Sequence, residues 1–432
     1  MTRSSQSNPT TPLAAGSGGS VVVERCQVCD ATELDPVFFA GYLPPVNGMP
    51  AIGERPRTEP AYPAQVLSCR RCKLAQLGLI VDPAILFPPS YPYTSGTTKI
   101  LRENFAQLYA EVAGLYPLAP SDLVVDIGSN DGTLLSNFHS HGIRVHGIEP
   151  TNAGKLANER GIRTLISFFH HQAVEAVLAA QAGRARIVTA TNVFAHIEDV
   201  GEVMRCLLRL LDDDGIFISE SHYWVALLKT LQYDTIYHEH LRYDSLTRLR
   251  FLLESHGLEV IRAREIPTHG GSIRVYAARR GKYPVDASVG EILTEEQQQL
   301  TDDALARFRR GVVDSKLGLY ALLKDIHAAG DRVYGIGAQS RASTLINHVG
   351  LDDGILDCVL EITGSYKIGK YIPGTLIPVL DESRLFTDQP RYALLLSWHI
   401  ADELIPKLAA RGFRGDYIIP LPVPRIVRGQ GG

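Results

Sequence analysis

The chain has 432 residues, of which 45% are hydrophobic and 21% are charged, and its formal net charge is −4. This length exceeds what one hydrophobic core usually holds, so two or three domains are expected. The small negative charge argues against nucleic acid as a partner, and the lack of an apolar run of about 18 residues argues against a membrane span. Residues 1–20 are rich in Ser, Thr, Gly and Pro, which predicts a disordered tail rather than a signal peptide, and hence a cytoplasmic protein.

Residues 21–88 are predicted to form a small metal-binding domain. They contain two CxxC pairs, formed by Cys26, Cys29, Cys69 and Cys72. Without a secretion signal, disulfides are disfavoured, and two such pairs can supply the four thiolates of a tetrahedral Zn²⁺ site. Four thiolates leave no position for a substrate, so the predicted role of the ion is structural. The alternative is two unrelated surface pairs.

Residues 89–282 show the pattern of a Rossmann-like α/β domain. A helix is predicted from Ile100 to about Leu115, and short apolar runs alternate with helical patterns after it. The predicted strands are Leu123–Ile127, Val145–Ile148, Ile187–Thr191 and Gly215–Glu220. This alternation predicts a parallel, doubly wound sheet.

Residues 283–432 are predicted to form a second Rossmann-like domain, with a boundary near Tyr283. Thr294–Ala328 has the spacing of one long helix, and a strand, a glycine turn and a helix start follow it. Further apolar runs at Ile355–Ile362 and Tyr392–Ser397 indicate a second parallel sheet.

The stretch VVDIGSNDGTLL, Val124 to Leu135, predicts a cofactor loop between a strand and a helix. Its glycines allow close backbone approach, and a carboxylate about 20 residues later can accept ribose hydroxyl hydrogen bonds. An acidic residue two positions before the first glycine favours S-adenosylmethionine (SAM) over NAD(P). The predicted cofactor residues here are Asp126, Gly128, Asn130, Gly132 and Glu149. The alternative is a plain strand–turn–helix.

Two later segments are predicted to border the same cofactor. Phe168 lies where an adenine-flanking side chain is expected, although a core position is the alternative. Asn192 and His196 follow the fourth predicted strand, close to the expected reaction centre. The competing interpretation of His196 is a hydrogen-bonded histidine at the start of a helix.

The stretch TIYHEHLRYDSL, Thr235 to Leu246, is dense in titratable side chains. Taken alone, it is compatible with a metal site, a catalytic centre or a polar patch. Catalysis is favoured, because HxH has no nearby third metal ligand and histidine titrates near neutral pH.

Seven motifs in fixed order then suggest a family: CxxC…CxxC, DIGSNDG, NVFAHI, YHEH, HGGSIRVY, GIGAQSRAS and KIGKYIPGTLIPV. From about Cys26 to Trp398 the chain resembles SAM-dependent C-methyltransferases that act on nucleotide-linked 4-keto-deoxysugars in antibiotic sugar pathways. The resemblance implies a zinc-binding domain, a SAM domain and a C-terminal Rossmann-like domain, with the sugar nucleotide in the cleft between them. It also implies a methyl transfer to the carbon next to the ketone, commonly C3 and in some members C5.

The resemblance further implies roles for individual residues. His240 is the expected general base, Tyr237 and Glu239 are its partners, and His196 and Tyr91 are further active-site residues. His238 is expected to point elsewhere.

In the C-terminal domain the resemblance implies contacts with the sugar nucleotide. The expected substrate-binding residues are Gly337, Ser340, Arg341, Glu361 and Lys367, with Arg341 against the diphosphate. Departures from the family pattern leave the nucleotide open, with dTDP preferred, and a monomer is expected. The alternatives are C5 methylation, another acceptor, or a non-catalytic zinc-stabilised ligand-binding protein.

Overall fold

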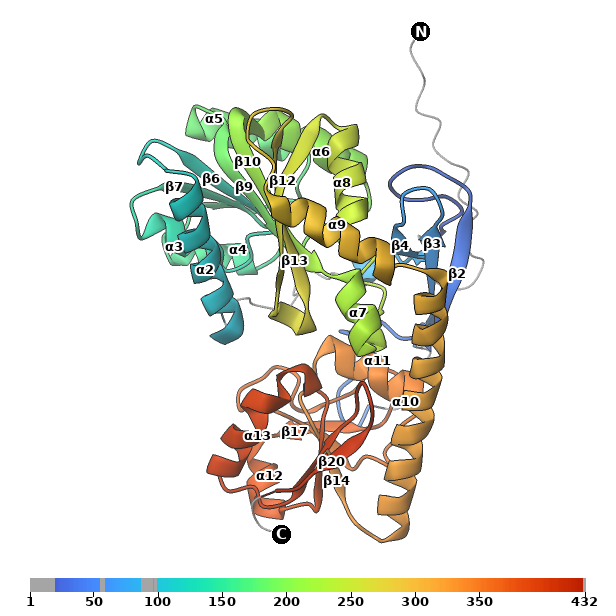
Figure 1. Ribbon diagram of the computed structural model, residues 1–432. Helices are drawn as coiled ribbons and strands as arrows, with labels where there is room; N and C mark the ends of the chain where they lie inside the picture. Colours follow the sequence, from blue (N-terminus) through green and yellow to red (C-terminus); the bar gives the residue numbers. More distant parts are fainter. Residues whose placement is uncertain (1–19, 55–58, 87–95, 97–98, 430–432) are drawn as a thin grey trace.

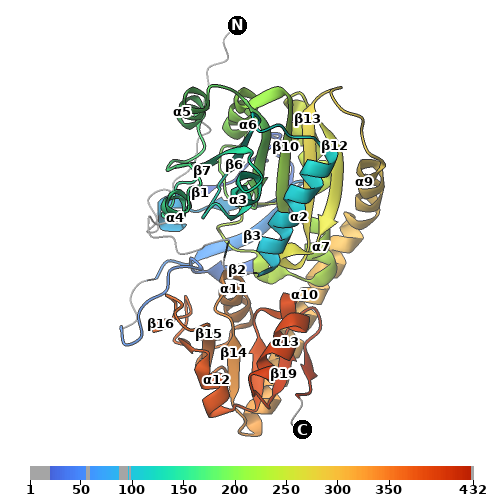
Figure 2. The same ribbon diagram turned by 90° about the vertical axis from the view of Figure 1, so that its left-hand side faces the viewer.

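The computed structural model describes residues 20–54, 59–86, 96 and 99–429, which form three domains (Figures 1 and 2). The central domain lies between the small N-terminal domain and the C-terminal domain along the sequence. In Figure 1 the C-terminal domain sits below the central one, and the long helix α10 runs along its side. None of the described helices is long and apolar enough to cross a membrane.

The N-terminal domain contains a four-stranded antiparallel sheet in the order β11-β4-β3-β2. Its elements are β1 (Val21–Val22), β2 (Leu34–Leu43), β3 (Tyr62–Cys69), β4 (Ala75–Leu77), β5 (Leu79–Ile80) and α1 (Pro83–Leu86). The fourth strand, β11 (Arg242–Tyr243), comes from the chain just after YHEH and pairs with β4. The predicted catalytic stretch is therefore joined to the cysteine-containing domain through a shared sheet.

The central sheet has the order β8-β7-β6-β9-β10-β13-β12. Its strands are β6 (Leu123–Ile127), β7 (Arg144–Ile148), β8 (Thr164–Leu165), β9 (Ala185–Thr191), β10 (Leu211–His222), β12 (Leu258–Ile266) and β13 (Ser272–Arg279). All five residues of β6 are buried, as expected for a strand covered on both faces by helices. The four predicted strands are confirmed, but the sheet is not purely parallel, because β13 runs antiparallel to both of its neighbours.

Helices cover this sheet on both sides (Figure 2). They are α2 (Lys99–Leu115), α3 (Thr133–His139), α4 (Ala153–Glu159), α5 (His171–Gln181), α6 (Val200–Leu210) and α8 (Leu246–Ser255). The helix α7 (Trp224–Thr230) and the short 3₁₀ turns η2 (Tyr233–Thr235) and η3 (Thr268–Gly270) lie at the end of the sheet that faces the C-terminal domain. The helix predicted from Ile100 to Leu115 is thus confirmed as α2.

The helix predicted over Thr294–Ala328 is two helices, α9 (Ala287–Gln299) and α10 (Asp302–Ala328). The break occurs because the Thr301 side chain accepts a hydrogen bond from Ala304 N at 3.2 Å and caps a new helix. Two aspartates in the first turn of α10 favour the same start. Since α9 packs against β12 and α8, the central domain continues past the boundary expected near Tyr283.

The C-terminal sheet has the order β16-β17-β15-β14-β18-β19-β20. Its elements are β14 (Val333–Ile336), α11 (Ser340–Val349), β15 (Cys358–Glu361), β16 (Lys370–Tyr371), β17 (Pro378–Asp381), α12 (Ser383–Asp388), β18 (Tyr392–Leu395), η4 (Trp398–Ile400), α13 (Ala401–Ala410), β19 (Asp416–Ile419) and β20 (Arg425–Val427). Its five inner strands are parallel, which confirms the second Rossmann-like sheet, and the two edge strands are antiparallel.

One hydrophobic core runs through all three domains. It joins Val66 of β3, Trp224 of α7, Phe308 of α10 and Leu345 of α11. Figure 2 shows β2 and β3 beside the junction of the two larger domains, where His348 Nδ1 donates to the carbonyl of β2 residue Ala40 at 2.9 Å. Because apolar burial continues across the junction, the three domains are packed against one another through a shared core.

Candidate functional site

The four predicted zinc ligands come together in the N-terminal domain. Sγ of Cys26 lies 3.4 Å from Sγ of Cys72, and Sγ of Cys29 lies 3.5 Å from Sγ of Cys69. All four sulfur atoms lie within 4.8 Å of one another. Tetrahedral Zn²⁺ with Zn–S bonds of about 2.3 Å requires sulfur separations of about 3.8 Å, so this cluster fits a structural zinc ion.

The predicted cofactor loop connects β6 to α3 and has the backbone that its glycines suggested. Gly128 has φ +67°, and a Cβ there would lie 2.6 Å from Val193 Cγ2. Gly132 has φ +77° and precedes α3. Both positions therefore require glycine, and the second brings the start of α3 close to the loop.

Carboxylates stand at the ends of the two strands beside this loop. Glu149 directly follows β7, and its carboxylate accepts hydrogen bonds from Asn130 N at 3.0 Å and from Thr151 Oγ1 at 2.6 Å. Asp126 is buried in β6, accepts a hydrogen bond from Thr189 Oγ1 at 2.6 Å, and burial raises its pKa to about 8. Acceptors in these places fit a cationic cofactor that carries ribose hydroxyl groups.

The remaining predicted cofactor residues flank the same strand ends. Phe168 is 64% exposed, which argues against the core alternative and leaves its ring available for stacking. Asn192 has φ +57°, and its Oδ1 is buried without a hydrogen-bond partner among the described residues. An unsatisfied buried acceptor beside the loop indicates a polar ligand there.

His240 is buried, and its imidazole is held in one tautomer. Its Nδ1 lies 2.9 Å from the carbonyl oxygen of Thr235, which can only accept a hydrogen bond. Nδ1 therefore carries the proton, and Nε2 carries the lone pair. Burial, reinforced by His196, lowers the pKa of His240 to about 3, so the ring is neutral near pH 7.

The other predicted residues of this stretch surround that ring. The Tyr237 ring centroid lies 4.2 Å from that of His240, and the His196 centroid lies 5.2 Å from it. His196 Nδ1 donates to the carbonyl of Glu239 at 2.6 Å. His238 points away, towards the Tyr62 ring of the N-terminal domain, as predicted. Tyr91 lies outside the described residues.

Sequence reasoning missed one partner of Glu239. Asn47, from the loop after β2, donates through Nδ2 to Glu239 Oε1 at 2.6 Å. The N-terminal domain thus contributes a side chain to the YHEH stretch. Since 192 residues separate the two, only the folded chain reveals the contact.

Further histidines extend the cluster towards the C-terminal domain. His222, the last residue of β10, has its ring centroid 5.0 Å from that of His240 and 5.3 Å from that of His269. Burial lowers the pKa values of His222, His269 and His399. Sequence reasoning missed His222. It could have been found from its place just after a predicted parallel strand, where ligands bind in α/β folds.

The C-terminal loop from β14 to α11 faces this cluster. Gly337 has φ +92°, and a Cβ there would lie 2.3 Å from Ser397 Oγ, so only glycine fits. Ser340 is the first residue of α11. Glu361, at the end of β15, accepts from Ala338 N at 3.0 Å.

Lys367 lies in the segment between β15 and β16, and its Nζ donates to Ala338 O of the β14–α11 loop at 2.7 Å. Burial lowers its pKa, while Glu361 and Glu239 act in the opposite direction. The amine of Lys367 is therefore close enough to both Glu361 and Glu239 of the YHEH stretch to interact with their charges.

Arg341 does not have the surroundings that the sequence suggested. Its guanidinium forms two hydrogen bonds with the Asp234 carboxylate, at 2.8 and 2.9 Å, and Trp398 Nε1 donates to the same carboxylate at 2.8 Å. The predicted diphosphate contact differs from this arrangement, because Asp234 already occupies the edge of the guanidinium formed by Nε and Nη2. Arg341 joins the C-terminal domain to η2, directly before YHEH.

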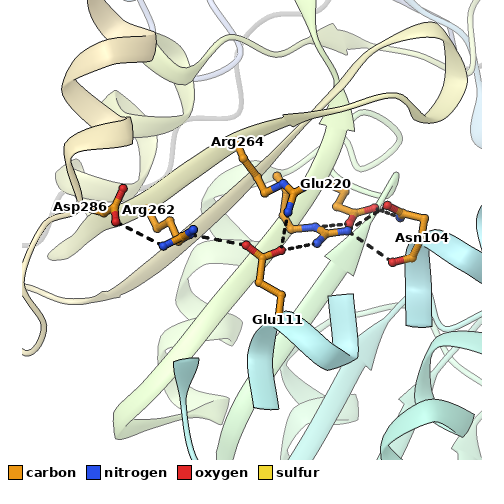
Figure 3. A network of polar contacts seen from close by, with 7 residues as sticks. Asn104, Glu111, Glu220, Arg262, Arg264 and Asp286 are labelled. Atoms are coloured by element: carbon orange, nitrogen blue, oxygen red, sulfur yellow. Dashed lines mark hydrogen bonds and ion pairs between the residues drawn. The ribbon is translucent and has the colours of Figure 1, made fainter. Parts of the chain in front are cut away.

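A buried ion-pair network holds α2 against one face of the central sheet (Figure 3). Glu220 of β10 accepts from Arg274 Nε at 2.6 Å and from Asn104 Nδ2 of α2 at 2.8 Å. Glu111 of α2 pairs with Arg264 at 3.2 Å and with Arg274 at 2.8 Å. The carboxylates of Glu111 and Glu220, joined through Arg274, thus fix α2 beside the cofactor loop.

Family profiles match three consecutive parts of the chain. They are a zinc binding domain over residues 26–87, a methyltransferase domain over residues 99–263 and a C-methyltransferase C-terminal domain over residues 267–422. The C-methyltransferase NovU of Streptomyces niveus is 34% identical over 416 residues, which cover 94% of this chain and 98% of NovU.

Solved structures also resemble part of the chain. The SAM-bound magnesium protoporphyrin IX methyltransferase of Synechocystis PCC 6803 is 17% identical with a TM-score of 0.32, over 41% of this chain and 79% of that one. The geranyl diphosphate C-methyltransferase of Streptomyces coelicolor A3(2) is 14% identical with a TM-score of 0.33, over 41% and 79%.

The full-length relative and the ordered domain matches agree with the site geometry. Four cysteines fit zinc, and the acidic glycine loop fits SAM. The chain therefore belongs to the zinc-binding, SAM-dependent C-methyltransferases, enzymes that transfer a methyl group from SAM to a carbon atom.

Proposed function

We propose that this C-methyltransferase acts on a dTDP-linked 4-keto-deoxysugar in natural-product sugar biosynthesis, and that it methylates C3, the carbon next to the ketone. The observation that carries the proposal is the neutral His240 imidazole, fixed in one tautomer between the cofactor loop and the C-terminal loop. A carbon acid beside a ketone needs such a base to lose its proton.

His240 is the proposed general base. Its Nδ1 is committed to Thr235 O, so the lone pair of Nε2 accepts the proton from C3. A base with a pKa of about 3 is weak, but the negative diphosphate and the developing enolate raise that pKa when substrate is bound. Tyr237 and Glu239 orient the ring and the sugar, and His196 lies beside them near the enolate oxygen.

The central loop is the proposed site of SAM, which when bound supplies a methyl group already activated on a sulfonium sulfur. Asp126 and the loop backbone hold the amino-acid part of the cofactor, and Glu149 accepts from the ribose hydroxyls. Asp126 lies in β6, and Glu149 directly follows the neighbouring strand β7 of the central sheet. His240, in the segment between η2 and β11, lies beside His222 at the end of β10. This placement aligns the carbanion with the methyl group.

The C-terminal loop is the proposed site of the nucleotide diphosphate. The N-terminus of α11 at Ser340 offers backbone N–H groups, and Gly337 before it allows the loop to approach a ligand closely. Lys367 brings a positive charge close to YHEH. Glu361 suits a hydrogen bond to a nucleoside hydroxyl. One chain supplies both loops and the base, so we propose that a monomer is active.

The test is incubation of the protein with SAM and a dTDP-4-keto-2,6-dideoxyhexose in deuterated water, followed by NMR and mass spectrometry. The proposal predicts a gain of one methyl group and loss of a carbon-bound hydrogen at C3. Deuterium exchange at C3 without methylation would support the base but reject this acceptor. Methylation at C5, oxygen or nitrogen would reject the proposed position, and neither exchange nor methylation would reject the sugar substrate.

A further inference from the structure

Arg242 links the zinc-binding domain to the loop that carries His196. Its side chain is 1% exposed. One guanidinium nitrogen, Nη1, donates to Gln27 Oε1 at 2.6 Å, and the other, Nη2, donates to Phe194 O at 2.8 Å and also to Ile197 O. A single buried guanidinium therefore holds both the first cysteine pair and residues on either side of His196.

The loop 192–199 is held by three residues of the chain that follows Tyr237. His196 Nδ1 donates to Glu239 O at 2.6 Å, and Leu241 N donates to Ala195 O at 2.8 Å. Arg242 adds the contacts with Phe194 and Ile197. Because these carbonyl groups surround one histidine, their geometry sets where its imidazole lies.

The zinc side of this link is equally specific. Gln27 directly follows the zinc ligand Cys26, and its backbone N–H donates to Gln76 Oε1 at 2.9 Å. Gln76 is fully buried and lies opposite Arg242 in the pairing of β4 with β11. Gln27 is therefore restrained on two sides, by Gln76 through its backbone N–H and by the neighbouring Cys26, as long as the first cysteine pair keeps its conformation.

The charge of Arg242 needs compensation. Burial, reinforced by Arg248, lowers the pKa of the Arg242 guanidinium to about 9, while Asp244, Glu198 and Cys26 act in the opposite direction. No carboxylate hydrogen-bonds to this guanidinium among the described residues. A zinc ion with four thiolates is net negative, because four ligand charges outnumber the two charges of the ion. The metal centre would supply countercharge that a buried guanidinium needs.

We propose that Arg242 is a positioning residue that transmits the shape of the zinc knuckle to the loop 192–199, and so places His196 beside the reacting sugar. The zinc site then stabilises the position of the active-site loop 192–199 as well as the fold of the N-terminal domain. This inference rests on the proposed role of His196, but its structural part does not depend on the acceptor.

Two variants separate the parts of the link. Gln27→Ala removes the zinc-side acceptor, and Arg242→Lys keeps the positive charge but loses the planar fork that reaches several acceptors. The matched control is Arg70→Gln, which removes an exposed arginine of the second cysteine pair that is bound only to Asp35 among its described partners.

Zinc content, hydrogen–deuterium exchange and kinetics are measured on all three proteins. In both link variants we expect one zinc per chain, faster exchange in peptides covering 192–199, and kcat lower by about tenfold, with KM for SAM changed less than about threefold. The cofactor affinity changes little because Asn192 is held separately, through its N–H to Glu220 O at 2.7 Å, and because Asp126 and Glu149 lie on or directly after other strands. The control should match the wild type in all readouts.

Unchanged exchange in residues 192–199 of zinc-loaded Gln27→Ala and Arg242→Lys would overturn the inference. If Arg242→Lys does not fold, Gln27→Ala decides, because its side chain is only half-buried. Exchange and zinc content need no sugar, so a wrong acceptor would leave the faster exchange in place. Faster exchange with unchanged kcat on the true acceptor would instead reject the role of His196.

Discussion

The two Rossmann-like sheets build the same loop at the same edge. Gly128 follows the first strand of the central sheet with φ +67°, and Gly337 follows the first strand of the C-terminal sheet with φ +92°. The N–H of each glycine donates to a carbonyl oxygen near the end of the neighbouring strand. Gly128 donates to Ile148 O and Gly337 donates to Leu360 O, both at 2.8 Å.

A glutamate fastens each loop in the same way. Glu149, at the end of β7, accepts from the backbone N–H of Asn130 at 3.0 Å. Glu361, at the end of β15, accepts from the backbone N–H of Ala338 at 3.0 Å. The backbone construction of the loops is therefore shared and does not by itself distinguish their ligands.

The charge next to each loop does distinguish them. At the central loop the carboxylates of Asp131 and Glu149 outnumber the guanidinium of Arg160, which pairs with Asp131 at 3.0 Å. At the C-terminal loop, in contrast, the amine of Lys367 donates directly to Ala338 O. A cationic sulfonium cofactor suits the first environment, and an anionic diphosphate suits the second. The comparison shows that the charged side chains beside the two loops, and not their backbone, distinguish a loop suited to SAM from a loop suited to a diphosphate.

The largest expected effect is at the base between the two loops. His240→Asn keeps a donor near Thr235 O but removes the Nε2 lone pair, so kcat should fall about 10³-fold. Binding of SAM and dTDP should change less than about twofold, because neither loop is altered. Steady-state kinetics and titration calorimetry measure both.

The control for that variant is His238→Asn, two residues away and directed at Tyr62. We expect its kcat to remain within about threefold of the wild type, because its side chain packs on the N-terminal domain. Equal losses of kcat in the two variants would show that the stretch matters only structurally.

The next effect concerns the Arg341–Asp234 ion pair, which joins the C-terminal domain to the central domain. Asp234→Asn leaves the buried Arg341 without its carboxylate, which should cost about 3 kcal/mol in the free energy of unfolding. The control Glu382→Gln breaks an exposed pair with Arg411 and should cost about 1 kcal/mol or less. Urea unfolding compares them, and equal midpoints would contradict an interdomain role for Asp234.

The smallest expected effect is of pH on the proposed base. Because burial lowers the pKa of His240 from 6.5 to about 3, its neutral form persists as pH falls from 8 to 5.5. In the ligand-free protein the neutral fraction of His240 should then change less than about twofold over this range, whereas an ordinary histidine would lose about tenfold of its neutral form. NMR titration of the His240 ring without ligands tests this, and a midpoint near 6.5 would contradict the buried, neutral base.

Much of the fold could be predicted from local patterns. The run LVVDI at β6 and the two CxxC pairs have few alternative structures, since their burial and ligand chemistry are encoded in adjacent residues. The break at Thr301 was missed because helical periodicity continues through it, and a single capping side chain decides where α10 begins. The reversed strand β13 depends on pairing over long sequence distances.

The candidate site also contains some residues that the sequence predicted and others that it did not. The place of Glu149 followed from the end of a predicted strand, and His240 was singled out through the YHEH motif of the family resemblance. Asn47 and Asp234 could not be predicted, since their partners lie 192 and 107 residues away. Arg341 was placed on the correct loop, but its partner in the other domain was not foreseeable.

The claim that charge assigns the two loops is tested most directly by titration calorimetry of wild type, Glu149→Gln and Lys367→Met with SAM and with dTDP. We predict that Glu149→Gln weakens SAM about tenfold and leaves dTDP unchanged, and that Lys367→Met does the reverse. If Lys367→Met leaves dTDP binding intact, or if either variant weakens both ligands equally, the assignment of the loops is wrong.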